Sequence, residues 1–351
     1  MPSCHQATFQ QASRPLPEFL MIITAKETSN PVSINSIGSY FVGGHHVDYC
    51  DNPMEEYVLA PNGVPVKINP NGTACVGQMY VQFVINASAQ DRPPIVFCHG
   101  GSMTGAVWES TPDGRPGWLN DFLKRGWSVF NIDAVERGRS GWAPREDEFS
   151  EPALLRTHQD TFTQFRIGKR VSDLCASSLQ RAAYPHCQFP LHAFKTFMKQ
   201  IVPRWAATDE LTLNAYVQML KELEQPVVLI AHSQGGHFAI RAAELVPHKV
   251  AAIVAIEPSQ AGTKEGIEKR LLKETPILTV YGDHLPLDAR WPAIRARTDA
   301  YFHALASAGG RVDALDLPEQ GIYGNSHLPM LEKNNLTISG LIDNWLVDRL
   351  L

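Results

Sequence analysis

The sequence lacks several features that would place it in a functional class at once. It has 351 residues and a formal net charge of -5 at pH 7, without the basic excess typical of nucleic-acid-binding proteins. It contains no run of about 18 apolar residues, so no membrane-spanning helix is expected. It also shows no internal repeat and no low-complexity tract. With 44% hydrophobic and 19% charged residues, the composition indicates a globular protein that has neither nucleic acid nor a membrane as its partner.

Cysteines are few, and a signal peptide is not recognisable. The six cysteines, at positions 4, 50, 75, 98, 175 and 187, show no C-x-x-C spacing and indicate no metal site. The N-terminal stretch has no basic n-region and no long apolar h-region. We therefore expect a cytoplasmic protein with reduced thiols. A misassigned start codon would leave export open, and Cys50 with Cys75 or Cys175 with Cys187 could then pair. The oligomeric state stays open, a homodimer included.

Apolar runs alternate with helical patterns over most of the chain. Strands are expected at "PPIVFC", "WSVFNID", "PVVLIAH", "KVAAIVAI", "PILTVY" and "RVDALD", and helical patterns follow most of them. This alternation predicts the α/β class, with a mostly parallel sheet covered by helices on both faces. In such sheets, ligands bind at the carboxyl ends of the strands. The polar residues discussed below all fall at those ends.

The chain divides into an irregular arm at 1–35, a core at 36–141 and 209–351, and an insertion at 142–208. The insertion is too long for a simple crossover and rich in aromatic residues and prolines, so we expect a mostly helical cap over the strand ends. Its Phe162 and Phe165 are candidates for the wall of an apolar pocket. Earlier in the chain, "VPVKINPNGTACVGQMYVQFVI" predicts a hairpin that turns at Asn-Pro-Asn-Gly.

Ser233, in "LIAHSQGGHFAI", is the candidate nucleophile. A serine hydroxyl needs a base and an exposed position on a tight turn, where bulky neighbours would clash. Ala231 and the two glycines after Gln234 meet that steric demand, although glycine is more usual at position 231. The alternative is a serine that only caps the following helix.

An oxyanion hole is expected from two backbone N–H groups. One belongs to Gln234, directly after the serine, and the other to Gly101 in "FCHGGSMTG" after an earlier strand. The alternative is a glycine-rich turn without a special function. The base is expected in a loop after the last strand, where "GNSHLPMLEKNN" contains His327. Of the 13 histidines, only His327 fits the chain order serine, acid, histidine.

The acid is ambiguous from the residues alone. The usual position after "PILTVYG" is Leu285, which cannot orient an imidazole, and Asp283 lies two residues earlier. Glu257 instead closes the apolar run "KVAAIVAIE", where a carboxylate is costly to bury without a partner. A histidine would be such a partner. Glu257 could also cap the helix after "PSQAG".

Together, "HGGSMTGAVWESTPDGRPGW", "NIDAVERGRS", "AHSQGG", "AIEPS" and "GNSHLPMLEKNN" resemble the α/β-hydrolases, and more narrowly their esterase 713-like branch. The resemblance runs from about Gly38 to the C-terminus. It implies the α/β-hydrolase fold with an inserted cap, and a catalytic glutamate after the sixth strand, which favours Glu257 over Asp283. The named esterase has cysteines after its "HG", where this chain has Gly101 and Ser102.

The expected function is hydrolysis of a small-molecule carboxylic ester, or of a lactone, through Ser233, His327 and Glu257. No metal and no organic cofactor is implied. Two enzymatic alternatives are hydrolysis of a thioester and of a carbon–carbon bond with the same residues. A third alternative is a binding protein that keeps the pocket without catalysis.

Overall fold

A computed structural model describes residues 31–89, 92–143 and 151–351. Its centre is an eight-stranded sheet with the strand order β1-β4-β6-β5-β7-β8-β9-β10. The strands from β6 to β10 are parallel, whereas β4 is antiparallel to β6 and to β1. The bounds are β1 (Ile34–Tyr49), β4 (Gly72–Asn86), β5 (Ile95–Cys98), β6 (Val129–Asp133), β7 (Val227–His232), β8 (Val250–Ile256), β9 (Ile277–Tyr281) and β10 (Val312–Asp316). The predicted α/β class and mostly parallel sheet are confirmed.

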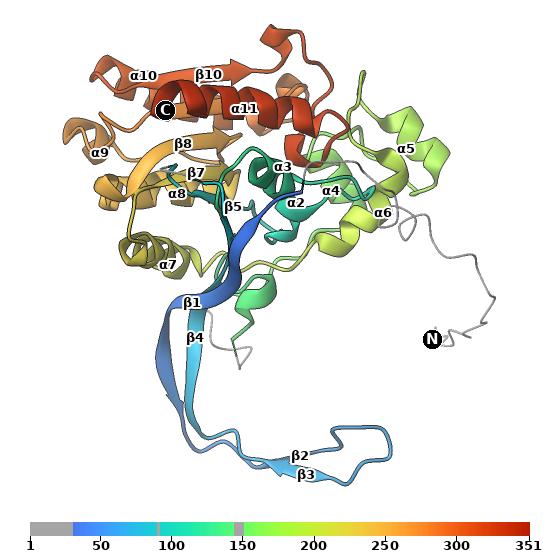
Figure 1. Cartoon of the computed structure of the whole chain (residues 1–351). Coiled ribbons are helices and arrows are strands. Elements are labelled where there is room, and N and C mark those ends of the chain that lie inside the picture. The colour runs from blue at the N-terminus through green and yellow to red at the C-terminus, as the bar shows by residue number, and fades with distance from the viewer. Residues whose placement is uncertain (1–30, 90–91, 144–150) are drawn as a thin grey trace.

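Helices cover both faces of this sheet (Figure 1). The bounds are α2 (Ala106–Glu109), α3 (Trp118–Lys124), α4 (His158–Gln164), α5 (Ala176–Ala182), α6 (Phe194–Phe197), α7 (Asp209–Glu222), α8 (Gln234–Leu245), α9 (Lys264–Glu268), α10 (Trp291–Ser307) and α11 (Asn335–Leu350). Side chains of β5 alternate between two cores. Ile95 and Phe97 join the core with α3 and α11, and Val96 and Cys98 join the core with α7, α8 and α10. Both faces of the central strands are therefore buried from solvent, which explains their continuous apolar runs.

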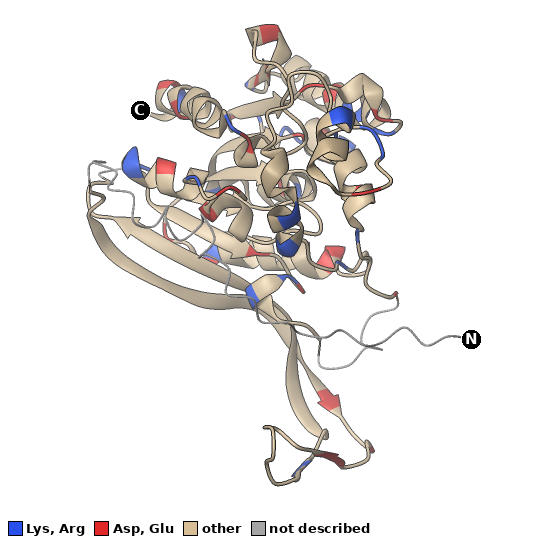
Figure 2. Cartoon of the chain, turned by 90° about the vertical axis from the view of Figure 1, so that its right-hand side faces the viewer, with Lys and Arg blue, Asp and Glu red and all other residues tan. Residues whose placement is uncertain are grey.

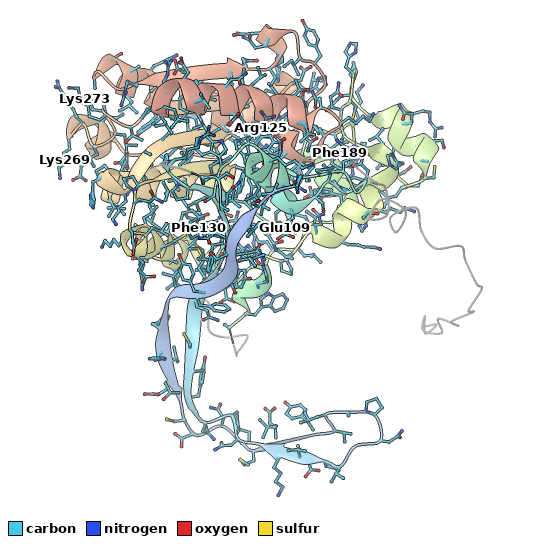
Figure 3. All side chains as sticks on the ribbon, in the orientation of Figure 1. Glu109, Arg125, Phe130, Phe189, Lys269 and Lys273 are labelled. Atoms are coloured by element: carbon cyan, nitrogen blue, oxygen red, sulfur yellow. The ribbon has the colours of Figure 1, made fainter. Side chains whose placement is uncertain are left out.

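The predicted hairpin around Asn-Pro-Asn-Gly is wrong. The strands exist, but β4 pairs with β1 over a long register, and β3 (Val66–Ile68) pairs with β2 (Glu55–Tyr57). Asn71, in the expected turn, bonds to Asn52 on the other limb (Asn71 Nδ2 to Asn52 O, 2.9 Å), which sets the pairing across the ribbon. The β1–β4 ribbon projects from the body and carries the small β2–β3 sheet at its tip (Figure 1). Figure 3 shows side chains dense in the body and sparse along this ribbon.

The insertion contributes α4, α5 and α6 between β6 and α7, but most of its described residues lie outside helices, so it is less helical than predicted. These helices are short, and four buried phenylalanines attach them to the body: Phe162, Phe189, Phe194 and Phe197. Most of the predicted N-terminal arm lies outside the described residues. Cys50, Cys75, Cys98, Cys175 and Cys187 are free thiols, so the alternative cysteine pairings are absent from this part of the chain.

Figure 2 shows basic and acidic residues interspersed along the chain. Within residues 31–89, 92–143 and 151–351, no helix is both long and apolar enough to cross a membrane. The same residues contain no cluster of histidine, cysteine and carboxylate side chains suited to a metal ion. The intracellular location stays a prediction.

The aromatic core beneath β5 gives a stability prediction. Trp108 is fully buried and stacks on Phe97 at a centroid distance of 5.0 Å. Trp108→Ala should lower the free energy of unfolding by about 3–5 kcal/mol, because it leaves a large cavity. Trp142 is 58% exposed, so Trp142→Ala should cost less than about 1 kcal/mol. Urea titrations of both variants measure the contrast, and equal losses would contradict this account of the core.

Candidate active site

Ser233 is the one residue between strand β7 and helix α8, and its backbone is strained. Its φ of 53° and ψ of -115° lie in a region that residues other than glycine rarely adopt. Two hydrogen bonds hold this turn. The Ser233 N–H donates to the Ile256 carbonyl (2.9 Å), and the Ser259 N–H donates to the Ser233 carbonyl (3.0 Å). Strain at a strand–helix turn is the geometry that raises a nucleophile above a sheet.

The glycines after the serine allow α8 to approach β5 closely. A Cβ atom on Gly235 would lie 2.4 Å from the His99 carbonyl oxygen and 2.8 Å from that of Cys98. Ser233 stands at the N-cap position of α8, yet its side chain makes no capping hydrogen bond. The alternative interpretation of Ser233 as a helix cap therefore finds no support in the geometry.

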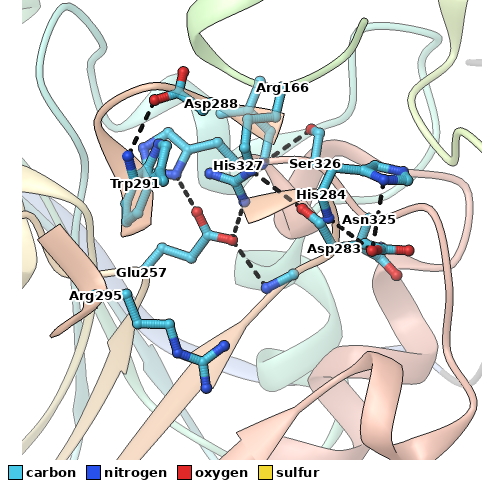
Figure 4. A network of polar contacts seen from close by, with 12 residues as sticks. Arg166, Glu257, Asp283, His284, Asp288, Trp291, Arg295, Asn325, Ser326 and His327 are labelled. Carbon is cyan, nitrogen blue, oxygen red and sulfur yellow. Dashed lines mark hydrogen bonds and ion pairs between the residues drawn. The ribbon is translucent and has the colours of Figure 1, made fainter. Parts of the chain in front are cut away.

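The structure brings His327 and Glu257 together, although 70 residues separate them. The Nδ1 atom of His327 lies 2.5 Å from Glu257 Oε2, and both side chains are buried (Figure 4). A carboxylate accepts, so Nδ1 carries the proton and Nε2 of the neutral ring is left as the acceptor. His327 is held between the rings of Trp291 and Phe165, at centroid distances of 4.8 and 5.5 Å. The neutral ring with its proton on Nδ1 is the tautomer that a general base requires, because Nε2 can then accept a proton.

Glu257 is a fully buried carboxylate with three partners. Besides contacting His327, it accepts a hydrogen bond from the Gly282 N–H at 2.9 Å. It also forms an ion pair with Arg166 Nη2 (Figure 4). Burial alone would raise the pKa of Glu257, but the Arg166 guanidinium and His327 outweigh it and lower that pKa to about 2. Glu257 is thus ionised at neutral pH, as an imidazole-orienting acid must be.

Burial lowers the pKa of His327 below its ordinary 6.5, Glu257 partly opposes this effect, and the Arg166 and Arg290 guanidiniums add to it. The imidazole is therefore neutral at pH 7 and able to accept a proton through Nε2. A base of this kind loses its function as the pH falls through its pKa. The acidic limb of an activity profile should accordingly lie below pH 6.5.

Asp283, the alternative acid, has other partners in this structure. Its carboxylate accepts the N–H groups of His284 (2.7 Å) and Gly324 (3.0 Å). Its backbone carbonyl accepts from Arg166 Nε at 3.1 Å. Asp283 thus orders the loop after β9 and makes no hydrogen bond to the His327 ring.

Ser233 and His327 face one cavity of about 140 Å³, which Gly101 and Gln234 also line. In the described part of the chain, neither the Gly101 N–H nor the Gln234 N–H has an acceptor. Both N–H groups are therefore free to donate, which the predicted oxyanion hole requires. Phe165 lines the cavity too, but Phe162 does not. Phe162 is fully buried and packs edge-on against Phe194 with a centroid distance of 5.3 Å. It is therefore a core residue, and its prediction as a pocket residue is wrong.

Sequence reasoning missed the residues that support these groups. Arg166 comes from the insertion, is 1% exposed, and lies over the Trp291 ring at 4.8 Å. His232 packs on His327 with a centroid distance of 4.4 Å and bonds through Nε2 to the His327 carbonyl (2.7 Å). Glu332 accepts the Ser326 N–H at 2.7 Å and so fixes the loop of His327. The contacts of Arg166 and His232 join segments that are distant in sequence, and the contact between Glu332 and Ser326 is local but belongs to no motif that the sequence analysis considered.

Residues 93–308 match the alpha/beta hydrolase fold family. The chain belongs to this family. A fungal relative (Fungal sp., strain ATCC 74256) named "Probable secreted lipase phiG" is 26% identical over 334 residues, covering 76% of this chain and 85% of its own. A solved structure described as a novel bacterial esterase is 32% identical, with a TM-score of 0.77. Its alignment covers 93% of this chain and 99% of the esterase.

Arg166 gives a prediction that separates positioning from mere packing. Arg166→Met should lower the free energy of unfolding by about 3 kcal/mol or more, because Glu257 loses its buried counter-ion. The pH profile of kcat/KM should also differ between Arg166→Met and the wild type. The guanidinium lowers the pKa of His327, so its loss should move the acidic limb to higher pH.

Arg166→Lys is the matched control, since it keeps the positive charge and should keep the acidic limb near its wild-type position. Urea unfolding and the pH dependence of ester hydrolysis provide the two measurements. If the acidic limb of the kcat/KM profile lies at the same pH in Arg166→Met as in the wild type, Arg166 contributes only to packing.

Proposed function

We propose that this protein is a serine hydrolase that cleaves a carboxylic ester, lactones included, through Ser233, His327 and Glu257. The observation that carries the proposal is one cavity that holds a strained Ser233, a buried and neutral His327, and two backbone N–H groups without acceptors. The fungal lipase and the bacterial esterase support the ester as substrate class. So does the resemblance to the esterase 713-like branch, in which the acid is a glutamate.

Acylation begins when the Ser233 oxygen attacks the carbonyl carbon of the ester while His327 Nε2 takes the hydroxyl proton. The oxyanion then accepts hydrogen bonds from the N–H groups of Gly101 and Gln234. Such a donor contributes about 3–4 kcal/mol in well-studied enzymes. Glu257 stabilises the imidazolium that forms. His327 then delivers its proton to the leaving alcohol, and the acyl group stays on Ser233.

Deacylation repeats these steps with water as the nucleophile. His327 Nε2 takes a proton from water, the hydroxide adds to the acyl carbon, and Ser233 leaves with the proton that His327 returns. The products are the carboxylic acid and regenerated enzyme. All proton transfers pass through one nitrogen atom, which the hydrogen bond from Nδ1 to Glu257 keeps directed at the cavity.

The nucleophile is tested by Ser233→Ala, which should lower kcat for a 4-nitrophenyl ester by about a million-fold. His327→Ala should be nearly as damaging, and the double variant little worse than either single one, because the residues act as a unit. Circular dichroism checks that each variant is folded. Failure of a fluorophosphonate to label Ser233 in the folded wild type would favour a binding protein without catalysis.

The acid is tested by two matched amide substitutions. Glu257→Gln should lower kcat by about ten-thousand-fold, as in the best-known triad, because the imidazolium loses its counter-charge. Asp283→Asn should have a mild effect, since Asp283 contacts backbone N–H groups away from His327. Steady-state kinetics on both variants measure the contrast. The reverse order of losses would assign the acid to Asp283.

A further inference from the structure

Three arginines line the cavity beside Ser233: Arg156, Arg204 and Arg290. Among the described residues, no aspartate or glutamate lines it with them. Arg156 and Arg204 come from the insertion, and Arg290 directly precedes α10. The remaining wall consists of aromatic, aliphatic and small polar residues. The cavity thus presents positive charge to a substrate at the reacting carbonyl.

The three guanidiniums differ in how many of their N–H groups are hydrogen-bonded to other residues of the protein. Arg290 bonds to Asp288 and, through two N–H groups, to the side chain and carbonyl of Gln164. Arg156 uses Nη1 for Asp160 and Gln164. Arg204 is the least satisfied. Its Nη2 lies 3.8 Å from Asp209 Oδ1, too far for a hydrogen bond, and its buried Nε has no partner.

Asp209 forms an ion pair with Arg204 but accepts its side-chain hydrogen bond from another residue. Gln234 Nε2 donates to Asp209 Oδ1 at 3.0 Å. A buried donor without an acceptor is costly, so the unmet Nε of Arg204 points to a ligand. A planar guanidinium with free N–H groups matches the two oxygens of a carboxylate.

Repulsion among these cations adds to the argument. Burial lowers the pKa of Arg156, Asp160 opposes this effect, and the charges of Arg290 and Arg204 lower it further. Buried Arg137 responds in the same way, through its own burial and the charge of Arg204. The guanidiniums are therefore close enough to destabilise one another, and an anion between them would relieve that repulsion.

Arg204 also lies beside the expected oxyanion hole. A Cβ atom on Gly101 would be 3.2 Å from Arg204 Nη1 and 3.1 Å from Gln234 Oε1. An anion held by Arg204 would consequently sit within a few bonds of the carbonyl under attack. The cavity volume of about 140 Å³ is below that of sites for drug-sized ligands, which favours a compact substrate.

We propose, building on the hydrolase function above, that the substrate is a small ester that carries a free carboxylate, and that Arg204 binds this carboxylate with help from Arg156. Arg204 is then a specificity-determining residue, and the chemistry of Ser233 and His327 is unchanged by it. The carboxylate belongs to either the acyl or the alcohol half of the ester, and substrate pairs distinguish the two.

The experiment compares esters of similar shape with and without the charge. The acyl pair is the 4-nitrophenyl monoester of succinate and the 4-nitrophenyl ester of 4-oxopentanoate. The alcohol pair is O-acetylglycolate and O-acetylglycolamide, followed by acetate release. In at least one pair, wild-type kcat/KM should favour the anion by about 10–100-fold, the range of a charge-assisted hydrogen bond.

The variants assign that preference to Arg204. Arg204→Gln should bring the ratio of anionic to neutral kcat/KM close to one, and Arg204→Lys should keep part of the preference through its charge. Arg349→Gln is the matched control, since Arg349 pairs with Asp313 on the surface of α11 and β10. It should leave the ratio at the wild-type value. Hydrolysis that depends on Ser233 but shows no anionic preference in either pair would overturn the carboxylate proposal alone.

Absence of hydrolysis with all four esters would instead count against the proposed function. Calorimetric titration with succinate then decides the subsite independently of turnover. Binding to the wild type that weakens about 10-fold or more in Arg204→Gln, but not in Arg349→Gln, supports the subsite. Equal binding or no binding in wild type and Arg204→Gln would overturn it.

Discussion

The buried carboxylate of Glu257 is the constraint on which the site depends. A charge with no solvent exposure is destabilising unless partners replace its hydration. Its partners come from three other segments: Arg166 in the insertion, Gly282 at the end of β9, and His327 in the loop before α11. Each of these segments must be in place for Glu257 to stay ionised. The insertion therefore contributes to the electrostatics around Glu257 and also forms a wall of the cavity.

The parts that could be predicted from sequence are those fixed by local chemistry. Continuous apolar runs such as that of β7 predict strands buried on both faces, and small residues around Ser233 predict a turn that only they can form. Glu257 stood out because it closes an apolar strand, where burial demands a partner. His327 followed from chain order. The signals for the strands, the turn and the position of Glu257 are local, whereas His327 needed the chain order and the choice of Glu257 over Asp283 needed the family resemblance.

The parts that could not be predicted depend on contacts between distant segments. Arg166 is one of several basic residues in the insertion, and only the fold shows that it contacts Glu257. The β1–β4 pairing stands in place of the nearer hairpin, extends over a long register, and is accompanied by the contact between Asn71 and Asn52. Phe162 and Phe165 are three residues apart with similar sequence surroundings. Both are buried in the same core, and only the tertiary packing lets Phe165 line the cavity as well.

The positive charges of the arginines around the cavity affect the ionisation of Glu257 and His327. Arg166 keeps Glu257 ionised, but it also opposes protonation of His327, as does Arg290. The imidazole of His327 is thus neutral, and in the proposed mechanism the imidazolium is correspondingly less stable. A substrate carboxylate beside Arg204 and Arg156 would offset part of that excess charge and make His327 easier to protonate. Binding of the proposed anion would in this way assist the proton transfer, because its negative charge would oppose the effect of Arg166 and Arg290 on His327.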